Sequence, residues 1–134
     1  MAAGWRRLIG GRSSEGIPLG LREKSRRLEE ESLEDLRVGC YNKAVSAAYF
    51  AVRLAAESKL RGLRTRRDDK IANALARVLS RTLGEGGAEL VRREYLSLFE
   101  ARKLADHRPY LFSREEAEDV VSRARKLLRV IEEI

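Results

Sequence analysis

The sequence predicts an all-α protein, an antiparallel bundle of four to five helices. Apolar residues recur at three- and four-residue spacing along most of the chain, and no segment alternates apolar and polar residues as a strand would. The segments between these periodic stretches are short, which favours antiparallel neighbours. A chain of 134 residues is the size of one domain and can bury a core without disulfides.

Residues 1–17 are predicted to form a flexible basic arm, because they are rich in glycine, serine and arginine. The helical domain is assigned to residues 18–134. Pro18 suits the first turn of a helix that ends near Val38. The apolar positions of this first helix are sparse and predict one narrow core-facing stripe: Leu21, Leu28, Leu33 and Leu36.

The second helix, residues 40–61 after a break at Gly39, is predicted to be the most buried element. Its unpaired Cys40 lies among apolar residues and is expected to be a buried structural thiol. Only a thin polar stripe remains on this helix: Asn42, Ser46, Arg53 and Glu57. We interpret this stripe as a solvated face, with a site or an interface as the alternative.

Two further helices follow the linker at residues 62–67. Either Asp68 or Asp69 can cap the first of them, and glycines at residues 84, 86 and 87 end it. Its predicted core positions are Ile71, Leu75, Val78, Leu79 and Leu83. The next helix runs from about residue 88 to His107, where Pro109 ends it. Its predicted core positions are Val91, Tyr95, Leu98, Phe99 and Ala105.

The last helix begins at a predicted capping box, in which Ser113 and Glu116 bond each other's backbone amides. It has the cleanest amphipathic pattern in the chain: Ala117, Val120, Val121, Ala124, Leu127, Leu128 and Ile131. Four aromatic residues of the earlier helices lie at core-facing or interhelical positions, and packing is favoured over base stacking: Tyr49, Phe50, Tyr95 and Phe99.

The charge is strongly basic, with a formal net charge of +7. Basic clusters favour polyanions such as RNA, although the preference for arginine could equally reflect a biased genome or a heat-adapted source. No apolar run is long enough for a signal peptide or a membrane span, so we expect a soluble, cytoplasmic protein without membrane contact.

Acid–base chemistry near neutral pH would centre on His107, the only histidine, and Arg102 could hold a phosphate beside it. Positions five apart on a regular helix are roughly 140° apart, so the two groups converge only if the helix breaks before His107 or across a symmetry axis. The alternative is that His107 only satisfies carbonyls at a helix end. No cluster has metal-ligand spacing, so we expect no metal and no cofactor.

Residues 39–51 (GCYNKAVSAAYFA) resemble the second-helix signature of the HEPN domain family. The matching positions are Gly39, Tyr41, Asn42, Ala44, Val45, Ser46, Ala48, Tyr49 and Ala51. Residues 102–107 (RKLADH) resemble the family's R-x(4-6)-H motif, and residues 113–117 (SREEA) resemble the start of its last helix. The similarity covers about residues 20–134 and is closest to short, stand-alone prokaryotic members.

This resemblance implies a HEPN-like bundle that acts as a metal-independent endoribonuclease, the toxin of a module with a small nucleotidyltransferase antitoxin. HEPN ribonucleases place two motif copies at a dimer cleft, so the resemblance implies a homodimer with Arg102 and His107 as catalytic residues and RNA as substrate. The expected nucleic-acid contacts are Lys103, Arg108, Arg64 and Arg66.

Two positions depart from the active members. Lys103 replaces a polar Asn, Asp or His, and Pro109 stands where toxin-type members often carry Tyr. Two alternatives therefore stay open. One is a non-catalytic HEPN subunit that binds a nucleotidyltransferase or a nucleotide, and the other is a helical assembly protein.

Overall fold

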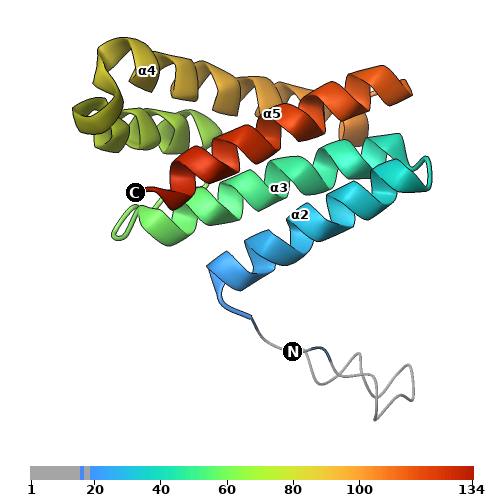
Figure 1. The fold of residues 1–134 in the computed structure, drawn as a ribbon, viewed down its shortest axis with the longest axis horizontal. Coiled ribbons are helices and arrows are strands. Elements are labelled where there is room, and N and C mark those ends of the chain that lie inside the picture. Colours follow the sequence, from blue (N-terminus) through green and yellow to red (C-terminus); the bar gives the residue numbers. More distant parts are fainter. Residues whose placement is uncertain (1–15, 17–18) are drawn as a thin grey trace.

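The computed structural model describes residue 16 and residues 19–134, so all of the predicted basic arm except Gly16 lies outside the described residues, as does Pro18. Within this range the chain forms four helices and no strand: α2 (Leu21–Arg37), α3 (Tyr41–Lys59), α4 (Asp68–His107) and α5 (Arg114–Glu132). The all-α prediction is confirmed. Figure 1 shows that α3 runs antiparallel to α2, and that α5 runs antiparallel to the second part of α4.

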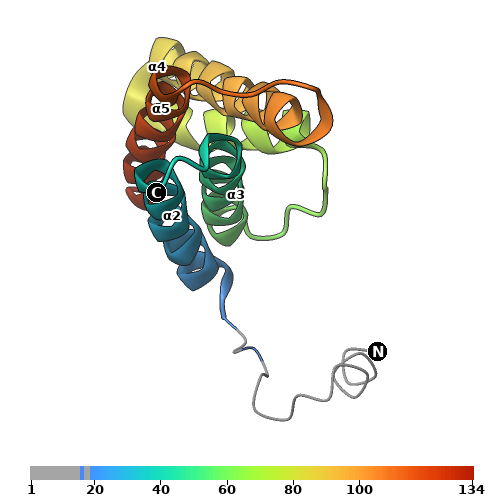
Figure 2. The ribbon, with the colours of Figure 1, turned by 90° about the vertical axis from the view of Figure 1, so that its right-hand side faces the viewer.

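Helix α3 is the centre of the bundle and packs against α2, α4 and α5 (Figure 2). Its composition explains this position, because small and β-branched apolar residues cover most of its circumference and let three neighbours approach closely. The buried residues are Ala44, Val45, Ala48, Tyr49, Ala51, Val52, Ala55 and Ala56. The prediction that this helix is the most buried element is confirmed.

The turn between α2 and α3 is a Schellman motif built on Gly39, whose φ is +85°. The amide of Cys40 donates to the Asp35 carbonyl at 2.8 Å, and that of Gly39 donates to the Leu36 carbonyl at 3.2 Å. Cys40 thereby precedes α3 in the turn and is exposed. The expectation of a buried thiol is wrong, because the residue never reaches the apolar face of the helix.

Helix α2 contacts α3 through two buried serines rather than through the predicted leucine stripe alone. Ser25 Oγ donates to the Ala51 carbonyl at 2.6 Å, and Ser32 Oγ donates to the Ala44 carbonyl at 2.7 Å. Of the four predicted leucines, Leu28 and Leu36 pack against the core, whereas Leu21 and Leu33 are 46% and 37% exposed. Leu21 is the first residue of α2, and Leu33 lies off the face that the serines define.

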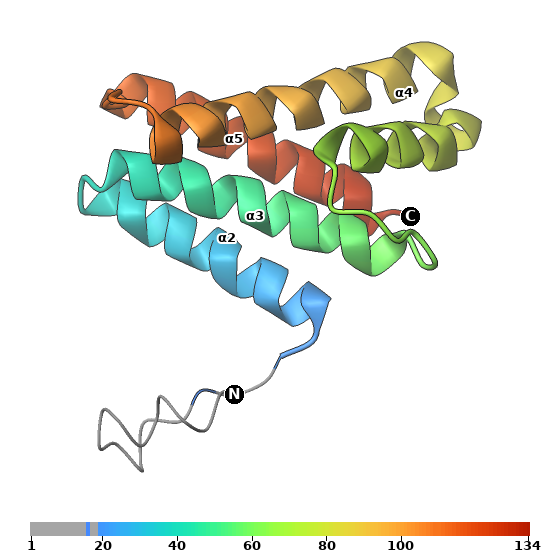
Figure 3. The same cartoon turned by 180° about the vertical axis from the view of Figure 1, so that it is seen from behind.

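Helix α4 is bent back on itself at Gly84, whose backbone is non-helical with φ 73° and ψ 176°. The two arms before and after Gly84 lie side by side, as Figure 3 shows from behind. The predicted glycine break is therefore confirmed, although the chain resumes its helix at once. Val78 and Leu83, both predicted core residues, are 44% and 43% exposed, so these two predictions are wrong.

Substitution of Gly84 with alanine should destabilise the bundle by about 1–3 kcal/mol, because this combination of φ and ψ is essentially restricted to glycine. A Cβ at Gly84 would meet no atom within 4 Å, so the effect is one of backbone conformation alone. The control is Gly86→Ala, which has open space and lies within the helix, and it should raise stability by about 0.5–1 kcal/mol. Urea denaturation measures both changes, and equal effects at the two positions would contradict this account.

Helix α5 begins at the predicted capping box. The Glu116 amide donates to Ser113 Oγ at 3.2 Å, and the Ser113 amide donates to Glu116 Oε1 at 2.9 Å. All seven residues predicted for its apolar face are buried. This helix therefore closes the bundle over α3 in the predicted manner.

Candidate functional site at the end of α4

Arg102 and His107 lie on different sides of the last turns of α4. The helix continues without interruption to His107, so the alternative of a helix break before His107 is wrong. Arg102 faces α3, whereas His107 is the exposed last residue of α4, and no hydrogen bond joins the two among the described residues. Within one chain these two predicted catalytic groups do not converge.

The Arg102 side chain is held on two sides. Its guanidinium carbon lies 5.0 Å from the centre of the Phe50 ring and 5.7 Å from that of Tyr49, a cation–π arrangement. Its Nε donates to Asp106 Oδ2 at 3.0 Å. Within residues 19–134 neither terminal guanidinium nitrogen donates a hydrogen bond, so both are free for an anionic ligand.

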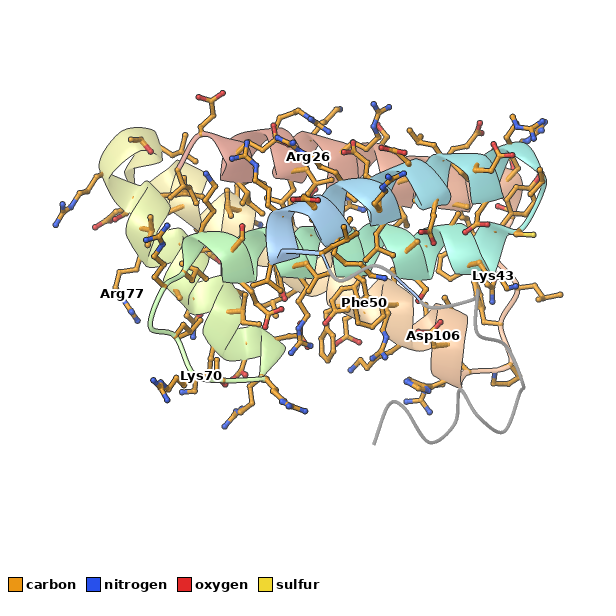
Figure 4. All side chains as sticks on the ribbon, turned by 90° about the horizontal axis from the view of Figure 1, so that it is seen from below. Arg26, Lys43, Phe50, Lys70, Arg77 and Asp106 are labelled. Carbon is orange, nitrogen blue, oxygen red and sulfur yellow. The ribbon has the colours of Figure 1, made fainter. Side chains whose placement is uncertain are left out.

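Asp106 connects this arginine to α3. Ser46 Oγ donates to the same oxygen, Asp106 Oδ2, at 3.0 Å. Figure 4 shows Phe50 and Asp106 on one face, where α3 meets the end of α4. Sequence reasoning missed Asp106, although its position four residues after Arg102 was a usable signal for an ion pair.

Asn42 fixes the chain that follows His107. Its Nδ2 donates to the carbonyls of Ala105 at 3.1 Å and Tyr110 at 2.7 Å, and its Oδ1 accepts from the Phe112 amide at 2.9 Å. One side chain on α3 thus holds both the last turn of α4 and the segment leading to α5. His107 is carried on backbone that is fixed from both sides.

The polar stripe of α3 is therefore not a solvated face, and that interpretation is wrong. Asn42 and Ser46 bond the end of α4, while Arg53 Nη1 donates to Tyr49 Oη at 3.1 Å and Arg53 Nη2 donates to the Arg66 carbonyl at 3.0 Å. The sequence signal for these interhelical bonds was an amide at Asn42 and a hydroxyl at Ser46, four residues apart on an otherwise apolar helix. These contacts hold the end of α4 and the linker against α3, and the alternative of a site or an interface stays a prediction.

The predicted nucleic-acid contacts lie in two places. Arg64 and Arg66 are exposed on the linker between α3 and α4, and Arg108 is exposed beside His107. The charge of Lys103 is paired with Glu100, whose Oε1 lies 3.0 Å from Nζ, and Nζ also lies 4.7 Å from the centre of the Phe99 ring. A groove of about 470 Å³ runs between the linker and α4, lined by Arg66, Arg67, Asp68, Asp69, Leu96, Phe99 and Glu100.

A buried polar cluster at the start of α4 was not predicted. Asp68 Oδ1 accepts from Tyr49 Oη at 2.5 Å and from Tyr95 Oη at 2.7 Å, and Arg53 Nη1 lies 3.5 Å from Asp68 Oδ2. Burial and the hydrogen bond to Asp68 raise the pKa of Tyr49 to about 12. The pKa of Tyr95 is raised for the same reasons, of which burial is the larger.

The prediction that Asp68 or Asp69 caps α4 is wrong. Arg67 occupies the cap position, and the two aspartates are the first two residues of the helix.

The aromatic residues behave as predicted. Tyr49 and Tyr95 are buried, and Phe50 and Phe99 are partly buried against the core. They place the Arg102 guanidinium over an aromatic surface that is continuous with the interior. Packing is their main role, and the support of Arg102 follows from it.

These features define a small helical-bundle domain with a polar site at the end of its long bent helix. The family model for the HEPN domain matches residues 20–134, and the chain belongs to this family. No curated protein and no solved structure matches the chain. Among the described residues, no helix has the length and apolar character needed to cross a bilayer, and no group of three or more His, Cys, Asp or Glu residues is arranged to hold a metal ion.

Proposed function

We propose that this chain is a metal-independent endoribonuclease and the toxin of a two-gene module with a small nucleotidyltransferase. The observation that carries the proposal is the state of Arg102, whose Nε is bonded to Asp106 and whose guanidinium lies over the Phe50 ring, while neither terminal nitrogen donates a hydrogen bond to another described residue. A planar pair of N–H donors in this state matches a phosphate. His107 is exposed on the same helix end and supplies an imidazole, a group that can both take and give a proton.

RNA carries its own nucleophile. One imidazole removes the proton from the 2′-hydroxyl, the oxygen attacks the adjacent phosphorus, and a protonated imidazole donates to the departing 5′-oxygen. Arg102 stabilises the charge that develops on the phosphorane. The products are a 2′,3′-cyclic phosphate and a 5′-hydroxyl end.

Two imidazoles are needed for separate base and acid roles, and each chain has one, so we propose a homodimer that brings two copies of the site together. Two exposed leucines close to His107 in the sequence support a dimer contact at this end of the bundle. Leu104 is 39% exposed and Leu111 is 87% exposed. Apolar side chains of this size gain free energy when a partner covers them.

Leu111→Glu should convert the dimer into a monomer and abolish cleavage without unfolding the bundle, because a buried charge at the interface is costly and Leu111 makes little core contact. Light scattering after gel filtration measures the mass. Leu90→Glu is the control, since Leu90 is 53% exposed on α4 away from the motif. A wild-type monomer at micromolar concentration would remove the two-copy mechanism.

Arg64, Arg66, Lys103 and Arg108 are the proposed RNA contacts. Replacing both Arg64 and Arg66 with alanine should weaken RNA binding and reduce the slope of log affinity against log salt by about 1.4–1.8, since each phosphate contact contributes roughly 0.7–0.9. Arg77→Ala with Arg81→Ala is the control, because both arginines are exposed and the charge change is equal. An unchanged slope in the linker variant would show that its arginines do not contact RNA.

A non-catalytic HEPN subunit that binds a nucleotidyltransferase or a nucleotide is the second candidate. The lysine at position 103 favours it, because active members usually carry Asn, Asp or His there. The Lys103 side chain is also held in an ion pair with Glu100. Co-expression with the neighbouring gene tests the partner common to both candidates. Clean separation of the two proteins on a sizing column would contradict the nucleotidyltransferase module.

The test of the ribonuclease is a time course of purified, partner-free protein on structured RNA. We expect cleavage that leaves cyclic phosphate ends and that continues when a chelator is added. RNA with 2′-O-methyl groups should remain intact, because its nucleophile is blocked. Folded dimeric protein that leaves unmodified RNA intact would favour the non-catalytic candidate.

A further inference from the structure

We propose that Asp106 is the positioning residue of Arg102, and that its carboxylate orients the guanidinium so that both terminal nitrogens can take one phosphate. This inference rests on the proposed function, because it assigns the ligand of Arg102 as a phosphate of RNA. Asp106 does not touch that ligand. It acts through the arginine alone.

The contacts define one orientation of the guanidinium. Asp106 Oδ2 accepts from Arg102 Nε and from Ser46 Oγ, both at 3.0 Å, so the carboxylate is itself held from α3. The Arg102 guanidinium carbon lies over the Phe50 ring, 5.0 Å from its centre. Because Asp106 is bonded at Nε, the end of the guanidinium formed by its two outer nitrogens carries no hydrogen bond to another described residue and can take a phosphate.

The stability of α4 itself does not explain this carboxylate. Asp106 is the next-to-last residue of α4, where the negative end of the helix dipole disfavours an acidic side chain. The order of arginine before aspartate at four-residue spacing is also the less favourable one for an ion pair on a helix. Because the residue is poorly placed for helix stability, its two hydrogen bonds point to a role in the site.

Charge alone predicts the opposite effect of its removal. A carboxylate beside a phosphate site repels RNA, so a variant without it should bind RNA more tightly if Asp106 acts only through its charge. If Asp106 positions Arg102, the same variant should cleave more slowly in spite of the gained attraction. The two explanations therefore predict opposite effects of removing the Asp106 carboxylate.

The experiment compares Asp106→Ala, Asp106→Asn, Arg102→Ala and the double alanine variant. Asp106→Ala should lower kcat by about 10- to 100-fold and raise KM, with little change in thermal stability, because a misoriented guanidinium binds the phosphate less well both before and during cleavage. Asp106→Asn should recover part of this loss, because its amide oxygen still accepts from Nε. In the Arg102→Ala background, loss of Asp106 should add nothing.

Asp119→Ala is the matched control. Asp119 pairs with Arg123 at 3.4 Å across four residues of α5, so its replacement removes an equal charge from a helix surface outside the site. Its kcat and KM should equal those of the wild type. Wild-type kcat in Asp106→Ala, or losses that add to those of Arg102→Ala, would overturn the positioning role while the ribonuclease proposal stands.

A binding measurement separates this inference from the proposed function. All variants are titrated with 2′-O-methyl RNA, which cannot be cleaved, and the Kd is read by fluorescence anisotropy. If the wild type cuts no RNA, the proposed activity fails, and weaker binding in Asp106→Ala that disappears in the Arg102→Ala background still supports positioning. Equal or tighter binding in Asp106→Ala would then overturn it.

Discussion

Replacing His107 with alanine should reduce RNA cleavage by about 10²- to 10⁴-fold, the usual contribution of a general acid or base. The bundle should remain folded, since the side chain is exposed at the end of α4 and makes no hydrogen bond to another described residue. Cleavage rates and circular dichroism measured on the same sample separate the two effects. Folded His107→Ala protein that cuts at the wild-type rate would refute the site assignment outright.

Variants at Arg102 show whether its guanidinium acts through its positive charge alone or through its planar pair of donors. Arg102→Ala should lower the cleavage rate by about 10²- to 10³-fold, the usual effect of removing one donor to the developing charge, and Arg102→Lys should restore little of it. Lysine keeps the charge but lacks the planar pair of outer nitrogens and the Nε contact with Asp106. Full activity in Arg102→Lys would mean that a point charge is sufficient at this position.

The largest effect on stability is expected at Asp68. Asp68→Ala should lower the free energy of unfolding by about 3 kcal/mol, because two buried tyrosine hydroxyls lose their acceptor and Arg53 loses its partner. Asp69→Ala is the control. Its side chain is 50% exposed in a pair with Arg67, so the change in stability should be small compared with that of Asp68→Ala. Equal denaturation midpoints for the two variants would contradict a structural role of the cluster.

The same cluster predicts how stability responds to alkaline pH. The pKa of Tyr49 is raised to about 12, above the ordinary value near 10. The folded state therefore favours the protonated hydroxyl, and this contribution is fully present below pH of about 10 and is lost as pH rises through about 12. Tyr49→Phe should flatten this part of the stability profile, as measured by urea denaturation from pH 8 to about 11.

Local sequence determined the helices and their ends. The break at Gly84, the turn at Gly39, the capping box at Ser113 and the extended backbone at Arg108 before Pro109 each depend on a few adjacent residues. Periodicity likewise identified the central helix and the face of α5, because a buried face repeats with the helical turn. The family followed from the same local features, and its match over residues 20–134 confirms it.

The tertiary structure decided which polar residues form the site. Ser46 meets Asp106 across 60 positions, and Asn42 meets Tyr110 across 68. It also decided that Cys40 is exposed and that Asp68 is a buried acceptor for two tyrosines instead of a cap. Periodicity tells which face of a helix avoids water, whereas a polar side chain on the boundary of that face is solvated or bonded according to the neighbour that packs there. That neighbour is set by the arrangement of the whole bundle.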